Sequence, residues 1–190
     1  MRYLNLLAIA LLLTLACKGS VEKQSADSQS VTESQSDADT SQRNPNFNYA
    51  RYTPTTMKDL LVKLDDILEG EQKGIYVSYG NISSKVDLIC AGEIRPMDVR
   101  KFNVMNITFS SVASMTQLVN LFQHEVLFTE DSSQYWLPVQ ELIMPNLVSE
   151  LKQGDKVSLY VYWLGAIIEE GGEYELLFLV NEFWRGPQNK

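Results

Sequence analysis

The sequence predicts an α+β domain with a curved, mostly antiparallel sheet and two to three helices; an alternative is that the sheet forms a partly open barrel. Apolar residues recur at helical spacing over residues 56–69. Two long alternating segments, 157–164 and 173–183, flank a Gly-Gly turn, which is typical of a β-hairpin. The composition from Phe47 to Trp184 is that of a globular protein, and its length suits one domain with a single core.

A helix and two strands are expected at the start of this domain. Thr55 or Thr56 suits the N-terminal cap of the helix over 56–69, and Gly70 suits its end. The strands are predicted at 74–80 and 85–94.

The next two elements are predicted as a strand and a helix. Apolar and polar residues alternate over 102–109 with the period of a strand. Ser110 or Ser111 would then cap a second helix. The apolar residues that would share one face of this helix are Met115, Leu118, Val119 and Phe122.

The second half of the domain is predicted to be rich in strands. Strands at 125–129 and 134–139 flank a turn-like segment, and Pro145 suits the first turn of a short third helix that runs to Lys152. The later hairpin strands are apolar on both faces. We therefore expect them to be central in the sheet, with a helix or a second sheet covering each face.

Residues 17–46 differ in composition from the domain that follows. They are rich in Ser, Gln, Asp, Glu and Thr, and contain no aromatic residue. Such a segment cannot bury enough apolar surface to offset the entropy of ordering. We expect a disordered acidic tether with a mean reach of roughly 30 Å, followed by a single globular domain over 47–190.

Residues 1–16 have the pattern of a secretory signal peptide, with a positive charge and then an apolar stretch shorter than the ~20 residues of a spanning helix. Residues 13–17 (LTLAC) resemble the lipobox of bacterial lipoproteins. The resemblance implies cleavage after Ala16, lipidation of Cys17 and stable anchoring by two or three acyl chains. Because Lys18 rather than Asp follows the cysteine, the resemblance also favours delivery of the protein to the outer membrane. The alternative is an ordinary secreted protein in which this cysteine occurs by chance.

The charge of the chain argues against nucleic acid as a partner. The chain has 16 Lys and Arg against 24 Asp and Glu, and loss of residues 1–16 would remove Arg2 alone, giving a net charge near −9. Phosphate contacts need clustered cations. With Cys17 lipidated, Cys90 would have no disulfide partner, and its apolar neighbours predict a small buried core residue.

Few residues suit catalysis or cofactor binding. His124 is the one histidine, and we expect it at the end of the second predicted helix, interacting with the helix C-terminus or solvent. The adjacent acids at 65–66 and 169–170 are interpreted as solvated charge, because neighbours on a helix do not face each other and the second pair lies in a hairpin turn. We expect no metal site, no cofactor and no enzymatic activity.

Four aromatic residues form the candidate binding surface: Tyr135, Trp136, Tyr160 and Tyr162. Packing of central strands would explain them most simply. If Tyr160 and Tyr162 line an open face, they could form an apolar or carbohydrate-binding groove, or a docking surface. The segment 135–140 is of special interest, because Trp136 and Pro138 interrupt a strand near a sheet edge.

These features favour a non-enzymatic, membrane-anchored domain that binds another component of the cell envelope or helps to assemble one. An alternative is a carrier of a small or lipidic ligand in a cavity of the sheet. A hydrolase that uses carboxylates is less favoured, because it would need two acids that converge in a cleft.

Overall fold

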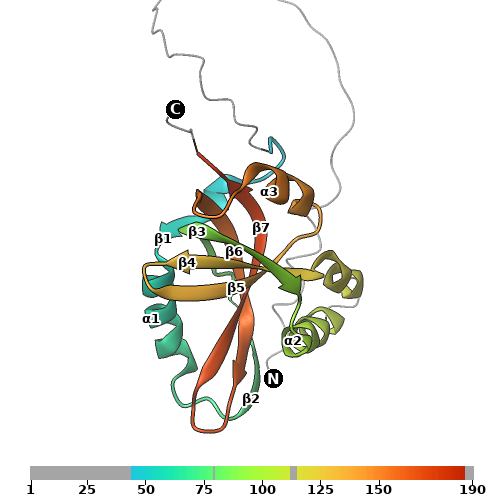
Figure 1. Cartoon of the computed structure of the whole chain (residues 1–190). Coiled ribbons are helices and arrows are strands. Elements are labelled where there is room, and N and C mark those ends of the chain that lie inside the picture. The colour runs from blue at the N-terminus through green and yellow to red at the C-terminus, as the bar shows by residue number, and fades with distance from the viewer. Residues whose placement is uncertain (1–43, 79, 112–114, 187–190) are drawn as a thin grey trace, which may run out of the picture. The chain divides into compact units, whose positions relative to one another are not determined.

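The computed structural model describes residues 44–78, 80–111 and 115–186 (Figure 1). The predicted signal peptide, Ala16, Cys17 and nearly all of the tether lie outside these residues. No helix among the described residues is long and apolar enough to cross a membrane.

The described part of the chain contains short helices interspersed among strands. The helices are the 3₁₀-helix η1 (Tyr49–Arg51), α1 (Met57–Leu68), α2 (Val99–Ser110), the 3₁₀-helix η2 (Thr116–Leu121) and α3 (Met144–Glu150). The strands are β1 (Thr53–Thr55), β2 (Gly74–Val77), β3 (Ser83–Pro96), β4 (His124–Glu130), β5 (Ser133–Val139), β6 (Lys156–Ile168) and β7 (Tyr174–Trp184).

The strands form one curved, mixed sheet of order β1-β3-β4-β5-β7-β6-β2. The β1–β3 and β5–β7 pairs are parallel, and the other pairs are antiparallel. An additional pairing of β3 with β6 joins β3, β4, β5, β7 and β6 in a circuit. The predicted fold class, α+β with a curved and mostly antiparallel sheet, is confirmed.

The long strand β3 takes part in both halves of this circuit. Its first half pairs with β6 over Ser83–Ile89, and its second half pairs with β4 up to Pro96. The register shifts between Cys90 and Ile94, where Gly92 has a φ of 80°. This left-handed conformation favours glycine and gives the bulge that bends the strand.

The connectivity of the circuit resembles that of an OB-fold. A meander of three strands (β3, β4, β5) is followed by a helix (α3) and a hairpin (β6, β7), and the hairpin returns to pair with the first strand. Closure is weakest at β5–β7, which share a single residue pair, Val139 with Val180. The sheet is therefore strongly curved but only partly closed.

Two groups of buried side chains stabilise the domain. The larger one fills the inside of the curved sheet, where Phe128, Trp163 and Phe178 are at most 2% exposed and α1 contributes Leu60 and Leu64. Such burial supplies most of the driving force for folding. The smaller group lies between α2, η2 and the outer face of the β6–β7 hairpin; it contains Val104, Met105, Val119, Phe122, Leu164, Leu177 and Leu179.

The strand predicted at 102–109 is wrong, because this segment belongs to α2. The Asp98 carboxylate caps the helix by accepting a hydrogen bond from the Arg100 N–H at 2.7 Å. Lys101, Val104 and Met105 are buried, a spacing of three and four residues. The apolar residues of this segment also fit a period of two, which is why the sequence predicted a strand. The helix cap, Asp98, lies before residue 102 and was not part of that pattern.

The helix predicted to begin at Ser110 or Ser111 is also wrong in its start and type. Ser111 ends α2, where its hydroxyl donates a hydrogen bond to the Thr108 carbonyl at 2.6 Å. The expected apolar face survives in the six-residue 3₁₀-helix η2 and the residue after it, where Val119 and Phe122 are buried. Serine occurs at both ends of helices, so its presence does not show whether a helix begins or ends there.

Cys90 is buried in the core, as predicted. Burial raises the pKa of its thiol; a hydrogen bond from the Gly92 backbone lowers the pKa and the Asp155 charge raises it, leaving a net increase.

We expect iodoacetamide at mildly alkaline pH to spare Cys90 in the folded protein and to alkylate it after unfolding, as read from the tryptic peptide that begins at Val86. Because the pKa of the thiol is higher in the folded state than in the unfolded state, its contribution to stability is complete at neutral pH. That contribution is lost as the pH rises from the unfolded pKa to the folded pKa. Equal labelling of both states would contradict this.

Candidate functional site

The candidate site lies where the curved sheet stays open, between β5 and β7. Above this opening, the Gln140 N–H donates to the Val180 carbonyl at 3.0 Å, beside the single Val139–Val180 pair. The next rung of a parallel ladder would need the N–H of residue 138 to reach the Phe178 carbonyl. Residue 138 is proline and has no N–H, so the ladder ends there.

We therefore expect Pro138→Val to lengthen the β5–β7 ladder. The new amide of residue 138 would face the Phe178 carbonyl and become a hydrogen-bond donor to it. Amide exchange measured by NMR should show this amide protected by at least about tenfold relative to the Gln134 amide. An amide at residue 138 that exchanges as fast as that of Gln134 would contradict this explanation of the opening.

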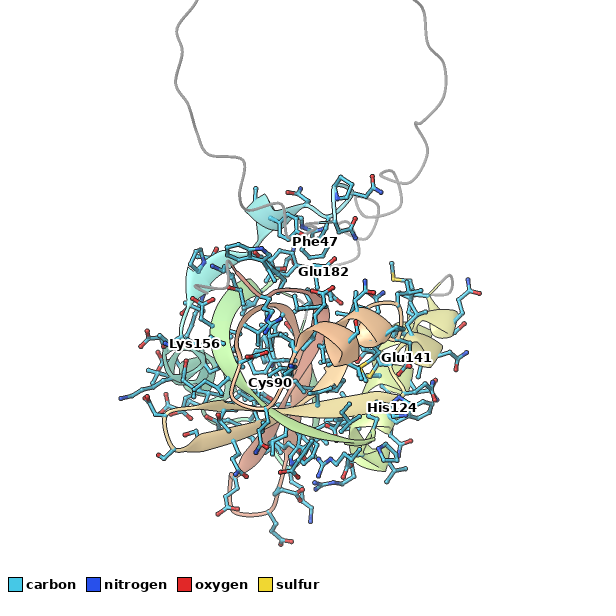
Figure 2. The ribbon with its side chains drawn as sticks, turned by 45° about the horizontal axis from the view of Figure 1, so that its top comes forward. Phe47, Cys90, His124, Glu141, Lys156 and Glu182 are labelled. Carbon is cyan, nitrogen blue, oxygen red and sulfur yellow. The ribbon has the colours of Figure 1, made fainter. Side chains whose placement is uncertain are left out.

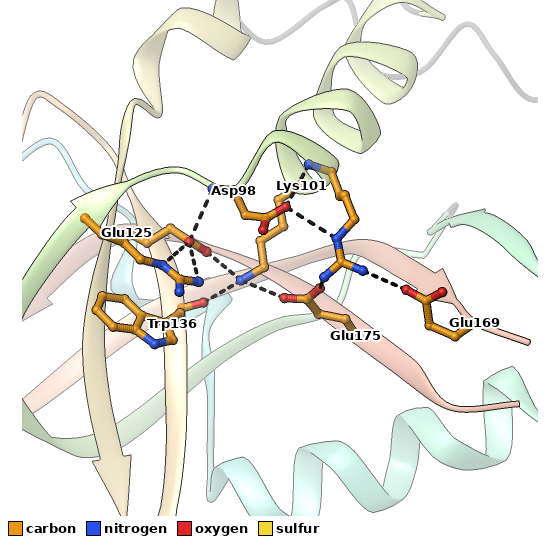
Figure 3. Close-up of polar contacts among 8 residues, drawn as sticks. Asp98, Lys101, Glu125, Trp136, Glu169 and Glu175 are labelled. Carbon is orange, nitrogen blue, oxygen red and sulfur yellow. Dashed lines mark hydrogen bonds and ion pairs between the residues drawn. The ribbon is translucent and has the colours of Figure 1, made fainter.

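The Lys101 ammonium occupies the upper part of the opening (Figure 3). This side chain, which α2 projects onto the sheet, is 3% exposed. Its Nζ lies 2.9 Å from the Trp136 carbonyl oxygen on β5, 2.5 Å from Glu125 Oε1 on β4 and 3.2 Å from Glu175 Oε1 on β7. Three donors therefore meet three acceptors from three strands, and Lys101 joins the strand edges that Pro138 leaves apart.

Glu125 is the buried anion of this group, with a fully buried side chain. Its Oε2 accepts hydrogen bonds from Arg95 Nε at 2.8 Å and from the Asp98 N–H at 3.3 Å. The Arg95 guanidinium also lies over the Trp136 ring, 4.1 Å from its centroid. Each buried charge is thus paired, as burial of ions requires.

Asp98 and Arg100 extend the ionic network to the β6–β7 hairpin. Partial burial raises the pKa of Asp98, but the hydrogen bond from the Arg100 N–H and the nearby charges of Arg100 and Lys101 outweigh burial and lower it. The Arg100 guanidinium contacts Glu169 at 2.7 Å and Glu175 at 2.8 Å (Figure 3). These exposed pairs fix the position of α2 more than they add to stability.

Below Lys101 the opening forms a surface cleft of about 380 Å³. Aromatic and aliphatic side chains from β5, β7 and α1 line it together with charged and polar side chains, so that its surface is about equally apolar and polar. Its lining includes Leu61, Arg95, Gln134, Trp136, Glu175 and Phe178. We call this space the seam cleft.

No protein-family model and no curated protein matches this sequence. The seam cleft is therefore interpreted from its own residues and geometry.

Helix α1 forms one wall of the seam cleft and is fastened at both ends. At its N-terminus, the backbone N–H groups of Met57 and Lys58 donate to the Glu130 carboxylate at 3.0 and 2.9 Å. Further along, the Tyr174 hydroxyl donates to Asp65 at 2.8 Å. Burial and this contact with Asp65 raise the pKa of Tyr174. The predicted helix over 56–69 is thus present, and its place beside β5 and β7 positions the site.

The structure separates the four aromatic residues of the candidate binding surface. Tyr135 and Trp136 both line the seam cleft, Tyr135 packing against the core and Trp136 lying against Arg95. Tyr162 is half-buried against the smaller apolar group, and burial is the main cause of its raised pKa. The segment 135–140, expected near a sheet edge, belongs largely to β5, which lies between β4 and β7 in the strand order but pairs with β7 only through Val139–Val180.

Tyr160 is covered by the segment that precedes β1. It is 3% exposed, and its ring centroid lies 5.6 Å from that of Phe47, 4.9 Å from that of Tyr49 and 5.5 Å from that of Tyr52. Asn44 reaches the nearby Glu182 carboxylate at 3.2 Å, and Figure 2 shows Phe47 and Glu182 at the same end of the domain. We call residues 44–55 the N-terminal strap.

His124 begins β4 rather than ending a helix. Its Nδ1 lies 2.9 Å from Glu141 Oε1 (Figure 2), and its side chain is 44% exposed. The adjacent acids identified from the sequence also have separate partners: Asp65 meets Tyr174, and Glu170 meets Lys73 at 3.0 Å. No group of three or more His, Cys, Asp or Glu that could hold a metal ion occurs among the described residues.

Sequence reasoning did not single out the charged residues of the site: Arg95, Lys101, Glu125 and Glu175. Lys101 and Glu125 are 24 residues apart. Lys101 directly follows Arg100, and Glu125 follows Gln123 and His124, so neither stands out locally as a lone charge in an apolar segment.

Proposed function

We propose that this chain is a membrane-anchored, non-enzymatic lipoprotein that binds another component of the bacterial cell envelope through the seam cleft. The observation that carries the proposal is the seam cleft itself, a space of about 380 Å³ lined by both apolar and charged or polar side chains. The lipobox-like residues 13–17 and the acidic segment after them support the anchor and the tether. Lys18 supports placement in the outer membrane.

The pairing of the charges supports binding over catalysis. Glu125 and Glu175 converge on one point, as a carboxylate hydrolase would require. Their shared partner is the buried Lys101 ammonium, and Glu125 is also bound to Arg95. Both acids are thus engaged in ion pairs that join α2, β4 and β7.

The packing of the sheet supports a surface site over an internal cavity. Large core side chains fill the inside of the curved sheet, including Phe128, Trp163 and Phe178. A carrier that holds a small or lipidic ligand in a cavity of the sheet would need an empty interior. A small ligand that binds this domain would more readily enter the seam cleft.

Site-specific photocrosslinking in cells tests the binding site. A photoreactive phenylalanine analogue at Gln134, an exposed residue of the cleft edge, should give a reproducible crosslinked species. The same analogue at Ile107 on α2, which is 50% exposed and does not line the cleft, is the matched control. Identical products at both positions, or none at Gln134, would contradict the proposed site.

Fractionation of cells tests the anchor separately. Cys17→Ser removes the thiol that would carry the lipid, so this variant should lose labelling by a tagged fatty acid and keep the mass of the uncleaved chain. Cys90→Ser is the matched control and should stay labelled in the membrane fraction. Fatty-acid labelling that persists in Cys17→Ser would refute lipid anchoring at this residue.

A further inference from the structure

We propose that the seam cleft binds an extended, uncharged peptide segment of a partner protein, which pairs through its backbone with the free edge of β5. This inference rests on the proposed function, because it names the ligand class of the same cleft. It is carried by the direction of the β5 backbone groups, the interruption at Pro138 and the charge balance of the lining.

The β5 edge presents alternate backbone groups to the cleft. The bond from Lys101 shows that the Trp136 carbonyl points away from β4. In an antiparallel pair, the N–H and C=O of one residue point to the same side, and successive residues alternate between sides. The groups of Gln134 and Trp136 therefore face the opening, whereas those of Tyr135 and Leu137 pair with Phe128 and Val126 of β4.

This edge lacks a strand partner below Pro138. The β5–β7 ladder consists of the Val139–Val180 pair alone. Among the described residues, Lys101 is the donor that reaches the Trp136 carbonyl, and no strand pairs with the Gln134 and Trp136 amides on that side. The Trp136 carbonyl is therefore taken by Lys101, whereas the Gln134 N–H and C=O and the Trp136 N–H remain as a template for an added strand.

The lining favours a ligand without net charge. Its cations, Arg95 and Lys101, are matched by Glu175 at the wall and Glu125 behind it. A charged segment would gain no net attraction and would lose hydration on entering. The apolar walls, which include Leu61, Trp136 and Phe178, suit the alternating side chains of an extended peptide.

The size of the edge limits the length of the segment. Residues 134–137 line the cleft, which corresponds to an edge of roughly 10–13 Å at the rise of a strand. An added segment would therefore make its backbone contacts over about four residues. Only every second residue of that segment would face β5 with its N–H and C=O.

The probe is a library of seven-residue uncharged peptides, acetylated and amidated, presented to the full chain purified from membranes in detergent. The selected peptide is then remade with N-methyl groups at alternate backbone nitrogens, in two complementary series. Methylation of the nitrogens that face β5 should weaken binding by about tenfold or more per site, since each loses a hydrogen bond. Methylation of the other series should leave affinity within about threefold.

Two variants at one position provide a matched control on the protein. Gln134→Pro removes an edge N–H that β4 does not use, whereas Gln134→Ala removes the side chain and keeps that N–H. The proline variant should lose the peptide and the alanine variant should retain it. If Gln134→Pro fails to fold, the two methylated series still decide the question.

The outcomes separate this inference from the proposed function. Equal effects of the two methylated series, or no peptide that binds saturably, would overturn the peptide inference. Saturable binding of a neutral oligosaccharide with NMR shifts at Trp136, and no binding of peptides, would overturn it while leaving a binding role for the cleft. Failure of crosslinking at Gln134 would count against the proposed function instead.

Discussion

Replacing Lys101 by methionine should lower the free energy of unfolding by about 3 kcal/mol. Methionine keeps the apolar stem but removes the ammonium that Glu125 contacts in a fully buried position. It also leaves the Trp136 carbonyl without the donor that joins it to β4 and β7. Guanidinium unfolding followed by circular dichroism measures the change.

A surface lysine and a double variant serve as controls for this prediction. Lys63→Met changes an exposed lysine of α1 and should alter stability by no more than about 0.5 kcal/mol. Lys101→Met combined with Glu125→Leu should be less destabilising than the sum of the two single changes. The double variant removes both charges of the pair, so that neither charge is left buried without its partner. Strict additivity would show that the two side chains do not stabilise the fold as a pair.

Replacing Trp163 by alanine should cost about 4 kcal/mol of unfolding free energy. Trp163 is 2% exposed at the centre of β6, where its indole N–H donates to the Gly165 carbonyl at 2.8 Å. Its ring also stacks on Tyr76 of β2, with centroids 5.7 Å apart. The substitution leaves a large cavity that the rigid sheet cannot close.

The same unfolding measurement on Trp184→Ala provides the comparison. Trp184 is the last residue of β7 and is only half-buried, so its loss should cost clearly less. A filler such as Trp163→Phe should recover part of the stability lost in the alanine variant, because it restores most of the apolar volume. Equal costs for the Trp163 and Trp184 variants would mean that β6 is not the centre of the core.

Local patterns predicted the elements whose periodicity has a single interpretation. The helix over 56–69 has a cap and a uniform apolar face, and the hairpin strands alternate around a Gly-Gly turn. The segment 102–109 failed because its apolar residues satisfy two periods at once. Only its cap, Asp98, and its packing on the β6–β7 hairpin select the helix.

The candidate site depends on contacts that no local pattern contains. The opening arises because Pro138 meets β7, which lies about forty residues later in the chain and pairs through Val180. The pairing of Lys101 with Glu125 and Glu175 joins three elements and likewise has no local signature. The sequence could nevertheless indicate that strand pairing is interrupted within 135–140, because Pro138 has no N–H for a ladder.

The N-terminal strap has a mechanical consequence for the proposed anchoring of the chain through Cys17. A pulling force from the proposed anchor would first load the hydrogen bond of Asn44 to Glu182, then the ring contacts of the strap with Tyr160, and then the three β1–β3 residue pairs. The strap contacts β7 near Glu182, whereas the seam cleft uses its opposite end, around Glu175. We therefore expect the strap to detach under force while the strands that line the cleft remain paired.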